Sequence, residues 1–98
     1  MKIIWSPLAI DRTTEIAEYI AQDNPSAATI WAETLFDKVE ILKSSPKSGR
    51  VVSESNRDDI REFIYGNYRI IYRVDKNILS VLTVRHGKQI LPLEETKA

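Results

Sequence analysis

The sequence predicts an α+β domain with the element order βααβββ, in which an N-terminal helical hairpin packs on a small, mainly antiparallel four-stranded sheet. Two observations predict this class. The last third of the chain holds three β-rich runs separated by Gly66-Asn67 and by Asp75-Lys76-Asn77, connections typical of β-hairpins. The first half holds two stretches with apolar residues at helical spacing. Because 98 residues suffice for one modest core, we expect residues 1–98 to form a single domain.

Start and stop signals place the elements along the chain. Ser6-Pro7 provides a helix cap followed by a proline at the first helical position, and Asn24-Pro25 repeats this signal for a second helix. The serine, proline and glycine residues after the second helix predict a loop that extends to residue 59. The predicted elements are a strand at residues 2–5, helices at 7–22 and 25–44, and strands at 60–65, 68–74 and 78–86.

The two turns predict the register of the last three strands. Counting back from the first turn pairs Tyr65 with Tyr68, Phe63 with Ile70, and Arg61 with Tyr72. A three-residue second turn pairs Val74 with Ile78, Tyr72 with Ser80, Ile70 with Leu82, and Tyr68 with Val84. Since side chains alternate along a strand, these pairings divide the sheet into two faces. The face predicted to pack on the helices carries Phe63, Tyr65, Tyr68, Ile70, Tyr72, Val74, Ile78, Leu82 and Val84, with Arg61 and His86 at its ends.

The opposite face mixes apolar and cationic residues, a combination that fits an acidic or anionic partner. Besides Arg61 at the end of the other face, the residues predicted to bind a partner are Glu62, Ile64, Arg69, Ile71, Arg73, Val81 and Arg85 of this face. Leu79 and Thr83 lie on the same predicted face. The alternative is that these arginines are ordinary solvated strand residues, since exposed cross-strand pairs of arginine and glutamate are common.

Composition excludes several classes of protein. The chain has no cysteine, so it has neither disulfides nor a thiol nucleophile. We predict no metal site and no cofactor, because the acidic residues of the first helix lack accompanying histidines. The N-terminal apolar run is too short for a signal peptide or a membrane span, and we expect a cytoplasmic protein. The formal net charge is zero, which argues against non-specific coating of nucleic acid.

Seven short motifs in order resemble the RelE/ParE toxin superfamily. They are WSPLAIDR at 5–12, EIAEYIA at 15–21, NPSAA at 24–28, PKSGR at 46–50, REF at 61–63, YRIIYRV at 68–74 and VRHGK at 84–88. The resemblance covers nearly the whole chain and implies the βααβββ fold reached above. It also implies the toxin of a type II toxin-antitoxin, or plasmid stabilisation, system, held silent by a cognate antitoxin whose extended C-terminal region wraps around it.

The resemblance leaves two activities open. RelE-like members are ribosome-dependent mRNA endonucleases that use cationic side chains to cut the RNA, whereas ParE-like members poison DNA gyrase without chemistry of their own. The RelE-like pattern has two lysines where this chain has Arg61 and Phe63, and an arginine where it has Gln89. Arg69 keeps the arginine of the YR motif. These departures favour the ParE-like activity, with no catalytic residue; a third possibility is an inactive member that only binds its antitoxin.

In the alternative nuclease, Arg69, Arg85 and His86 would carry the phosphodiester step, with ribosome and mRNA as the target. His86 is the only histidine, and its ordinary pKa near 6.5 suits a general acid or base. The predicted register places His86 on the face opposite Arg69 and Arg85, where catalytic groups cannot converge. A structural role for His86 at the strand end is therefore the favoured interpretation.

Overall fold

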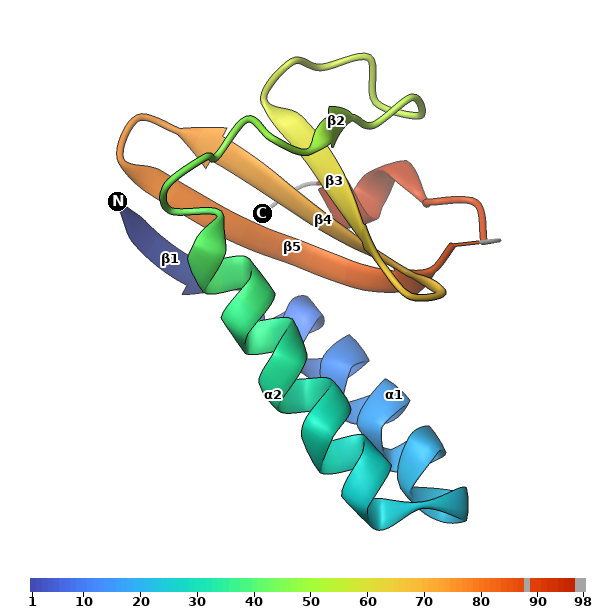
Figure 1. The fold of residues 1–98 in the computed structure, drawn as a ribbon. Helices are drawn as coiled ribbons and strands as arrows, with labels where there is room; N and C mark the ends of the chain where they lie inside the picture. The colour runs from blue at the N-terminus through green and yellow to red at the C-terminus, as the bar shows by residue number, and fades with distance from the viewer. Residues whose placement is uncertain (88, 97–98) are drawn as a thin grey trace.

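The computed structural model describes residues 1–87 and 89–96 and confirms the α+β class (Figure 1). The lysine of the VRHGK motif, Lys88, lies outside the described residues. Five strands rather than four are present in the described part of the chain, because a two-residue strand follows the second helix. The elements are β1 (Lys2–Trp5), α1 (Pro7–Asp23), α2 (Pro25–Ile41), β2 (Arg50–Val51), β3 (Ile60–Tyr65), β4 (Tyr68–Asp75), β5 (Ile78–His86) and the 3-10 helix η1 (Leu93–Thr96).

The sheet has the strand order β1-β5-β4-β3-β2, with β1 parallel to β5 and all other pairs antiparallel. The helical hairpin lies on one face of the sheet and projects beyond its edge, whereas the C-terminal segment lies at the other face (Figure 1). Each face has its own core. The helix-side core joins Leu35, Val39, Ile70, Tyr72, Leu79, Val81 and Val84, among others, and a smaller second core joins Val52, Ile60, Ile71, Leu82 and Leu91.

Both helices begin where the caps predict. The Ser6 hydroxyl accepts a hydrogen bond from the Ala9 N–H at 3.0 Å, and the Asn24 side chain accepts one from the Ala27 N–H at 3.1 Å. The Asn24 N–H also donates to the carbonyl of Ile20, so one residue ends α1 and starts α2. The second helix ends at Ile41 rather than at residue 44, and a series of turns continues to that point.

The first hairpin has the predicted register. Tyr65 pairs with Tyr68, Phe63 with Ile70, and Arg61 with Tyr72. Gly66 takes a φ of 58° in the turn, a conformation that glycine adopts without steric cost. Phe63 and Ile70 accordingly pack against the helix-side core.

The second hairpin does not have the predicted register. Its turn is two residues long rather than three, with Asp75 paired to Ile78, because Lys76 takes the positive φ of 53° that lets the chain reverse there. The observed pairs are Tyr72 with Val81, Ile70 with Val84, and Tyr68 with His86. The shorter turn shifts the pairing of β5 by one residue relative to the prediction. A β-bulge opposite Ile71 and Tyr72 adds one residue to β5 and shifts the pairing beyond it by one more.

The shorter turn and the bulge together determine which β5 side chains face which core, the turn for residues 78–82 and the bulge for those that follow. Leu79 and Val81 lie on the helix side, where the predicted register had excluded them, and Leu82 lies in the second core, where it had not been expected. The Leu82 carbonyl at the bulge accepts a hydrogen bond from the Ser6 hydroxyl at 2.8 Å. The serine that caps α1 therefore also satisfies a backbone group of the irregular strand.

The loop before β2 is held down by Tyr72. Its hydroxyl donates to the Pro46 carbonyl at 2.8 Å and accepts from the Gly49 N–H at 3.0 Å. A Cβ at Gly49 would lie 2.5 Å from the Glu62 carbonyl oxygen, so the close approach of loop and sheet requires glycine. This contact accounts for the glycine of the PKSGR motif and brings Arg50 beside β3.

Candidate functional site

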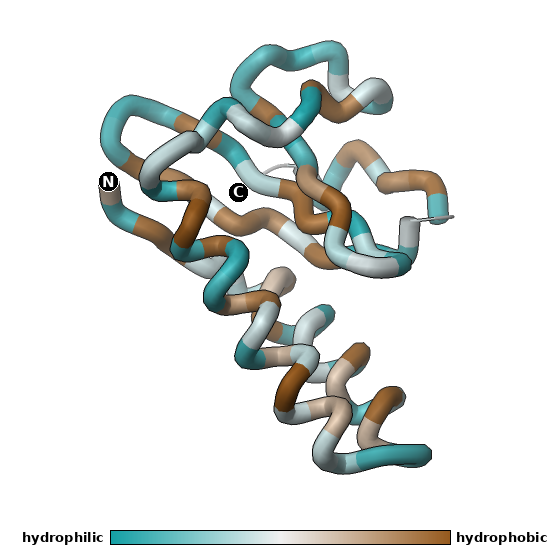
Figure 2. The backbone as a smooth tube through the Cα atoms, in the orientation of Figure 1, coloured by the Kyte–Doolittle hydropathy of each residue, from teal (hydrophilic) through white to brown (hydrophobic). Residues whose placement is uncertain are grey.

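The predicted partner-binding face is covered by the chain's own segments. Glu62, Arg69, Ile71 and Val81 are buried, with relative exposures of 0 to 7%, so the predicted exposure of these residues is wrong. Val81 faces the helices because the turn between β4 and β5 is one residue shorter than predicted. The other three lie under the loop around Glu54 and the C-terminal segment, and Figure 2 shows hydrophobic residues on that segment beside the sheet. Sequence reasoning missed this cover because the segment is short and lacks a strand or α-helix pattern.

Arg69 lies at the centre of a buried ion network. Two of its nitrogens donate to the Glu54 carboxylate at 2.9 Å each, a bidentate contact, and its Nε donates to Glu62. A further hydrogen bond reaches the Gln89 carbonyl at 3.2 Å. Arg50 contacts the second oxygen of Glu62 at 2.8 Å. The two carboxylates raise the pKa of Arg69, which is permanently charged and fully engaged inside its own chain.

A second network holds the C-terminal helix η1 to the sheet. Glu95 accepts hydrogen bonds from Thr83 at 2.8 Å, from Arg85 at 2.7 Å and from Arg12 of α1 at 3.2 Å. Burial favours the neutral carboxyl, but these three donors outweigh it and lower the pKa of Glu95 below its ordinary value. One carboxylate therefore engages guanidinium groups from α1 and β5.

The remaining residues of the predicted partner site differ in their surroundings: one is bonded to its own chain, one is half-buried and one is exposed. Arg61 donates to the Gly49 carbonyl at 2.9 Å and contacts Asp58 at 3.0 Å, so it too is engaged locally. Arg73 is half-buried on β4. Ile64 is 51% exposed near the end of β3 and remains available to a partner. The structure does not present the eight residues as one accessible surface.

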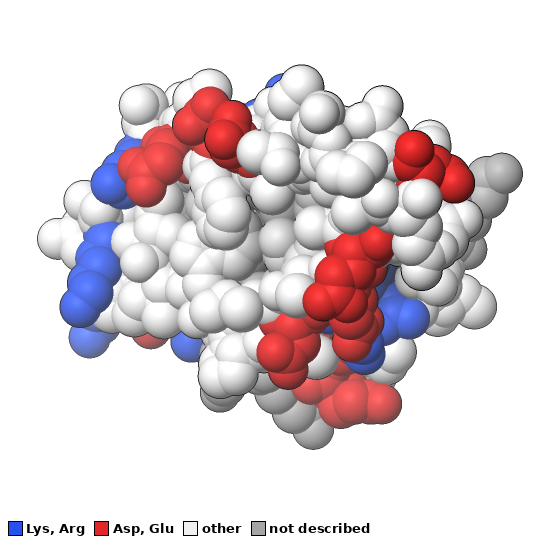
Figure 3. Space-filling model, turned by 90° about the horizontal axis from the view of Figure 1, so that it is seen from below, with Lys and Arg blue, Asp and Glu red and all other residues white. Residues whose placement is uncertain are grey.

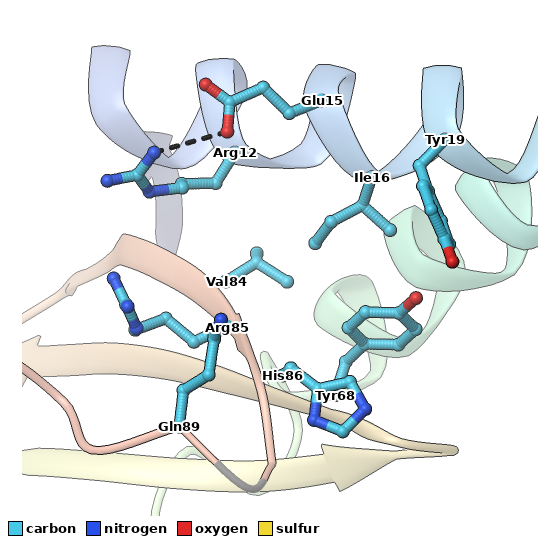
Figure 4. A pocket seen from close by; sticks show the side chains of 9 residues that line it. All are labelled: Arg12, Glu15, Ile16, Tyr19, Tyr68, Val84, Arg85, His86 and Gln89. Carbon is cyan, nitrogen blue, oxygen red and sulfur yellow. Dashed lines mark hydrogen bonds and ion pairs between the residues drawn. The ribbon is translucent and has the colours of Figure 1, made fainter.

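A cleft lies between α1 and the ends of β4 and β5, with a volume of ≈440 Å³ (Figure 4). Arg12 and Arg85 lie at one end of it. At the other end, the Tyr19 side chain points from α1 toward Tyr68 and His86. The residues that line the cleft are Arg12, Glu15, Ile16, Tyr19, Tyr68, Val84, Arg85, His86 and Gln89.

The three residues of the alternative nuclease are not brought together. Arg85 and His86 line the cleft, whereas Arg69 lines a separate depression beside Glu54 and Glu62. The His86 ring contacts the edge of Tyr68, with ring centroids 5.8 Å apart. His86 lies on the predicted face of the sheet, the face that carries Tyr68. The shorter turn and the bulge each shift the pairing of β5 by one residue, and a total shift of two residues leaves the side chain on the same face.

A second hollow, an apolar groove between α1 and α2, was not predicted. It has a volume of ≈630 Å³, and its floor consists mostly of small residues such as Ala17, Ala21, Ala28 and Ala32. Two large apolar side chains at the groove are substantially exposed, Ile10 at 51% and Phe36 at 46%. Residues 7–41 hold seven acidic and two basic residues, a net charge of −5. Figure 3 shows a wide uncharged surface bordered by acidic side chains, with basic side chains at its left edge and among the acidic ones at the lower right.

The described residues contain no cluster of three or more histidine, cysteine, aspartate or glutamate side chains that could hold a metal ion. Within the described part of the chain, no helix has the length and hydrophobicity to span a bilayer.

The ion network of Arg69 makes stability depend on acid pH. Hydrogen bonds from Arg69, and one from the Leu91 N–H, lower the pKa of Glu54 from 4.5 to about 2. A lowered pKa means that Glu54 stabilises the fold above pH 4.5 and that this contribution is lost as the pH falls from 4.5 to 2. We expect a loss on the order of 3 kcal/mol in the free energy of unfolding over that interval.

Urea unfolding between pH 7 and pH 2 measures this loss. The variant Glu54→Gln should be less stable than the wild type at pH 7, and the difference should shrink below pH 4. An equal difference at all pH values would show that the carboxylate charge of Glu54 is not the cause.

Comparison with known proteins gives three concordant results. Residues 3–91 match the family model described as the ParE toxin of the type II toxin-antitoxin system parDE. The chain is 32% identical over 93 residues, 93% of either protein, to the Sinorhizobium fredii protein named "Putative toxin Y4kP". A solved structure described as a chromosomal ParDE system from P. aeruginosa superposes with a TM-score of 0.73 at 16% identity, covering 90% of this chain and 97% of that one, a likeness of fold.

Proposed function

Because the chain belongs to the ParE toxin family of type II toxin-antitoxin systems, we propose that it inhibits DNA gyrase by binding, and that a cognate antitoxin neutralises it. The observation that carries this choice over mRNA cleavage is the engagement of Arg69 by Glu54 and Glu62, in a depression that His86 does not line. A gyrase inhibitor requires a surface and no proton transfer. Gyrase lies in the cytoplasm, so the proposal places the toxin there.

The geometry gives little support to phosphodiester cleavage. A nuclease needs cations that reach the phosphorane and a general acid or base beside them. Arg69 is 7% exposed and bound by two carboxylates, so a phosphate group would have to displace both. His86 lines a different depression from Arg69.

The surface best suited to the antitoxin is the apolar groove between α1 and α2. We propose that an amphipathic segment of the antitoxin lays apolar side chains on the alanine floor, beside Ile10 and Phe36. Glu18 and Glu33 line the same groove, and the hairpin carries a net charge of −5, so the flanks of that segment should be basic.

The activity test uses purified protein in two assays. We expect inhibition of gyrase supercoiling and no site-specific cleavage of mRNA on ribosomes. Activity in neither assay would favour a member that only binds its antitoxin, and cleavage of mRNA would overturn the proposal.

His86→Ala separates the two activities inside cells. We expect this variant to retain most of the toxicity of the wild type, because binding to gyrase requires no general acid or base. In a nuclease that used His86 in this role, the loss would be about 100-fold to 10,000-fold in rate. Growth after induction measures toxicity, and a thermal melt confirms that the variant is folded. Loss of killing by a folded His86→Ala protein would contradict the expectation.

A further inference from the structure

We propose that the cleft between α1 and the ends of β4 and β5 binds one nucleotide unit of single-stranded nucleic acid. The base lies among Tyr19, Tyr68 and His86, and the phosphate lies at Arg12 and Arg85 (Figure 4). This binding is separate from inhibition of gyrase and from cleavage. The cleft volume of ≈440 Å³ is within the range for small-ligand sites.

The aromatic end has the features of a stacking site. The Tyr19 side chain is largely free of packing, since the residue is 70% exposed although it stands over a cleft. Tyr68 is held in place from behind by Trp31, with ring centroids 5.3 Å apart, and from the side by His86. An exposed ring that faces a packed ring can stack on a flat base, and base stacking on aromatic side chains tolerates any sequence.

The cationic end has donors that a phosphate can reach. Arg12 Nη1 contacts Glu15 at 3.2 Å, and the Glu15 side chain is 62% exposed, so this surface ion pair costs little to break. Arg12 Nη2 and Arg85 Nη1 share one oxygen of Glu95, which holds the two guanidinium groups at the same end of the cleft. A phosphate that displaces the Glu15 contact therefore meets two guanidinium groups, while the Glu95 carboxylate and the displaced Glu15 carboxylate stay nearby.

The combination of the two ends favours a nucleotide over an acidic peptide. Carboxylates of a peptide would suit the arginines, but three rings at the other end offer flat surfaces and hydrogen-bonding tips that match a nucleobase. Ile16 and Val84 line the cleft between the ends and provide an apolar contact for the sugar.

The test measures binding of fluorescently labelled hexathymidylate, as DNA, to the purified full-length protein by anisotropy at low salt. We expect saturable binding that Tyr19→Ala weakens about tenfold, whereas Tyr19→Phe stays within about twofold of the wild type. Tyr19 is exposed, so its replacement does not endanger the fold. Ile30→Ala is the matched control, an exposed apolar residue on α2 outside the cleft, and should bind as the wild type does.

The salt dependence tests the phosphate end. One neutralised phosphate predicts a slope of about −0.7 for log K against log salt, and the slope should be shallower in Arg12→Gln. No saturable binding, or equal binding by wild type and Tyr19→Ala, would overturn the proposal. Competition by inorganic phosphate as strong as by thymidine monophosphate would also overturn it, since only an anion would then be recognised. Binding of a hexaglutamate peptide that depends on Tyr19 and is stronger than binding of hexathymidylate would overturn the proposal as well.

Discussion

Replacing Arg69 with alanine is expected to lower the free energy of unfolding by about 3–5 kcal/mol. The replacement leaves Glu62, with a side chain 4% exposed, and Glu54, with a side chain 23% exposed, without the guanidinium that neutralises them. Removing one partner of a buried ion pair strands the other charge, and that penalty is larger than the net contribution of the pair itself. Since a domain of this size has about 5–15 kcal/mol in total, the melting temperature should fall by at least about 12 °C.

Arg50→Ala is the matched control for this prediction. Arg50 contacts the same Glu62 carboxylate, but its side chain is 70% exposed, so its loss should cost no more than about 1 kcal/mol. Combining Arg69→Met with Glu54→Gln and Glu62→Gln should restore part of the stability, because no unpaired charge is then buried. If Arg69→Ala melts within a few degrees of the wild type, the network does not hold the sheet face. Loss of toxicity in an unfolded Arg69 variant would say nothing about catalysis.

Thr29→Trp is expected to weaken binding of the antitoxin by about 30-fold to 100-fold, a change typical of a blocked interface centre. Thr29 lines the apolar groove and is exposed, and its hydroxyl contacts the Pro25 carbonyl of its own helix at 3.4 Å. An indole there fills the space that the antitoxin segment would occupy, at little cost to the helix. Isothermal titration with the cognate antitoxin gives the affinity.

Two further variants complete this experiment. Ser26→Trp, one turn earlier on α2, is exposed and does not line the groove, so it should bind the antitoxin normally. The double reversal Glu18→Lys and Glu33→Lys should slow association and reduce its dependence on salt, because it reverses the charges that would attract a basic segment. Wild-type affinity in Thr29→Trp would place the antitoxin on another surface.

The sequence was sufficient for the elements whose signals are local. Ser6-Pro7 and Asn24-Pro25 place both helix starts, and Gly66 places the first turn together with its register, because each depends on the conformational preferences of one or two residues. The family was also predictable, since short motifs spread over the whole chain keep their order. The comparisons confirm the assignment to ParE-type toxins.

Features that depend on distant contacts were not predictable. At the bulge in β5, the Leu82 carbonyl accepts a hydrogen bond from Ser6. The apolar pattern of residues 78–86 reveals neither the bulge nor this contact. The arginines looked like a partner surface because the carboxylates that neutralise them, Glu54 and Glu95, come from a loop and from the C-terminal segment. A signal was nevertheless present: acidic residues next to isolated leucines after the last strand.

The hydrogen bond from Ser6 to the Leu82 carbonyl joins residues 76 positions apart, and the parallel pairing of β1 with β5 spans a similar distance. During translation the ribosome makes β1 well before β5. Such distant pairings fold slowly, since a long loop must close before any contact stabilises it. The apolar groove includes Trp5 of β1, and the cleft includes β5, so neither surface is complete on a nascent chain that has not yet released residue 82. Both proposed binding surfaces therefore form only after β5 has left the ribosome.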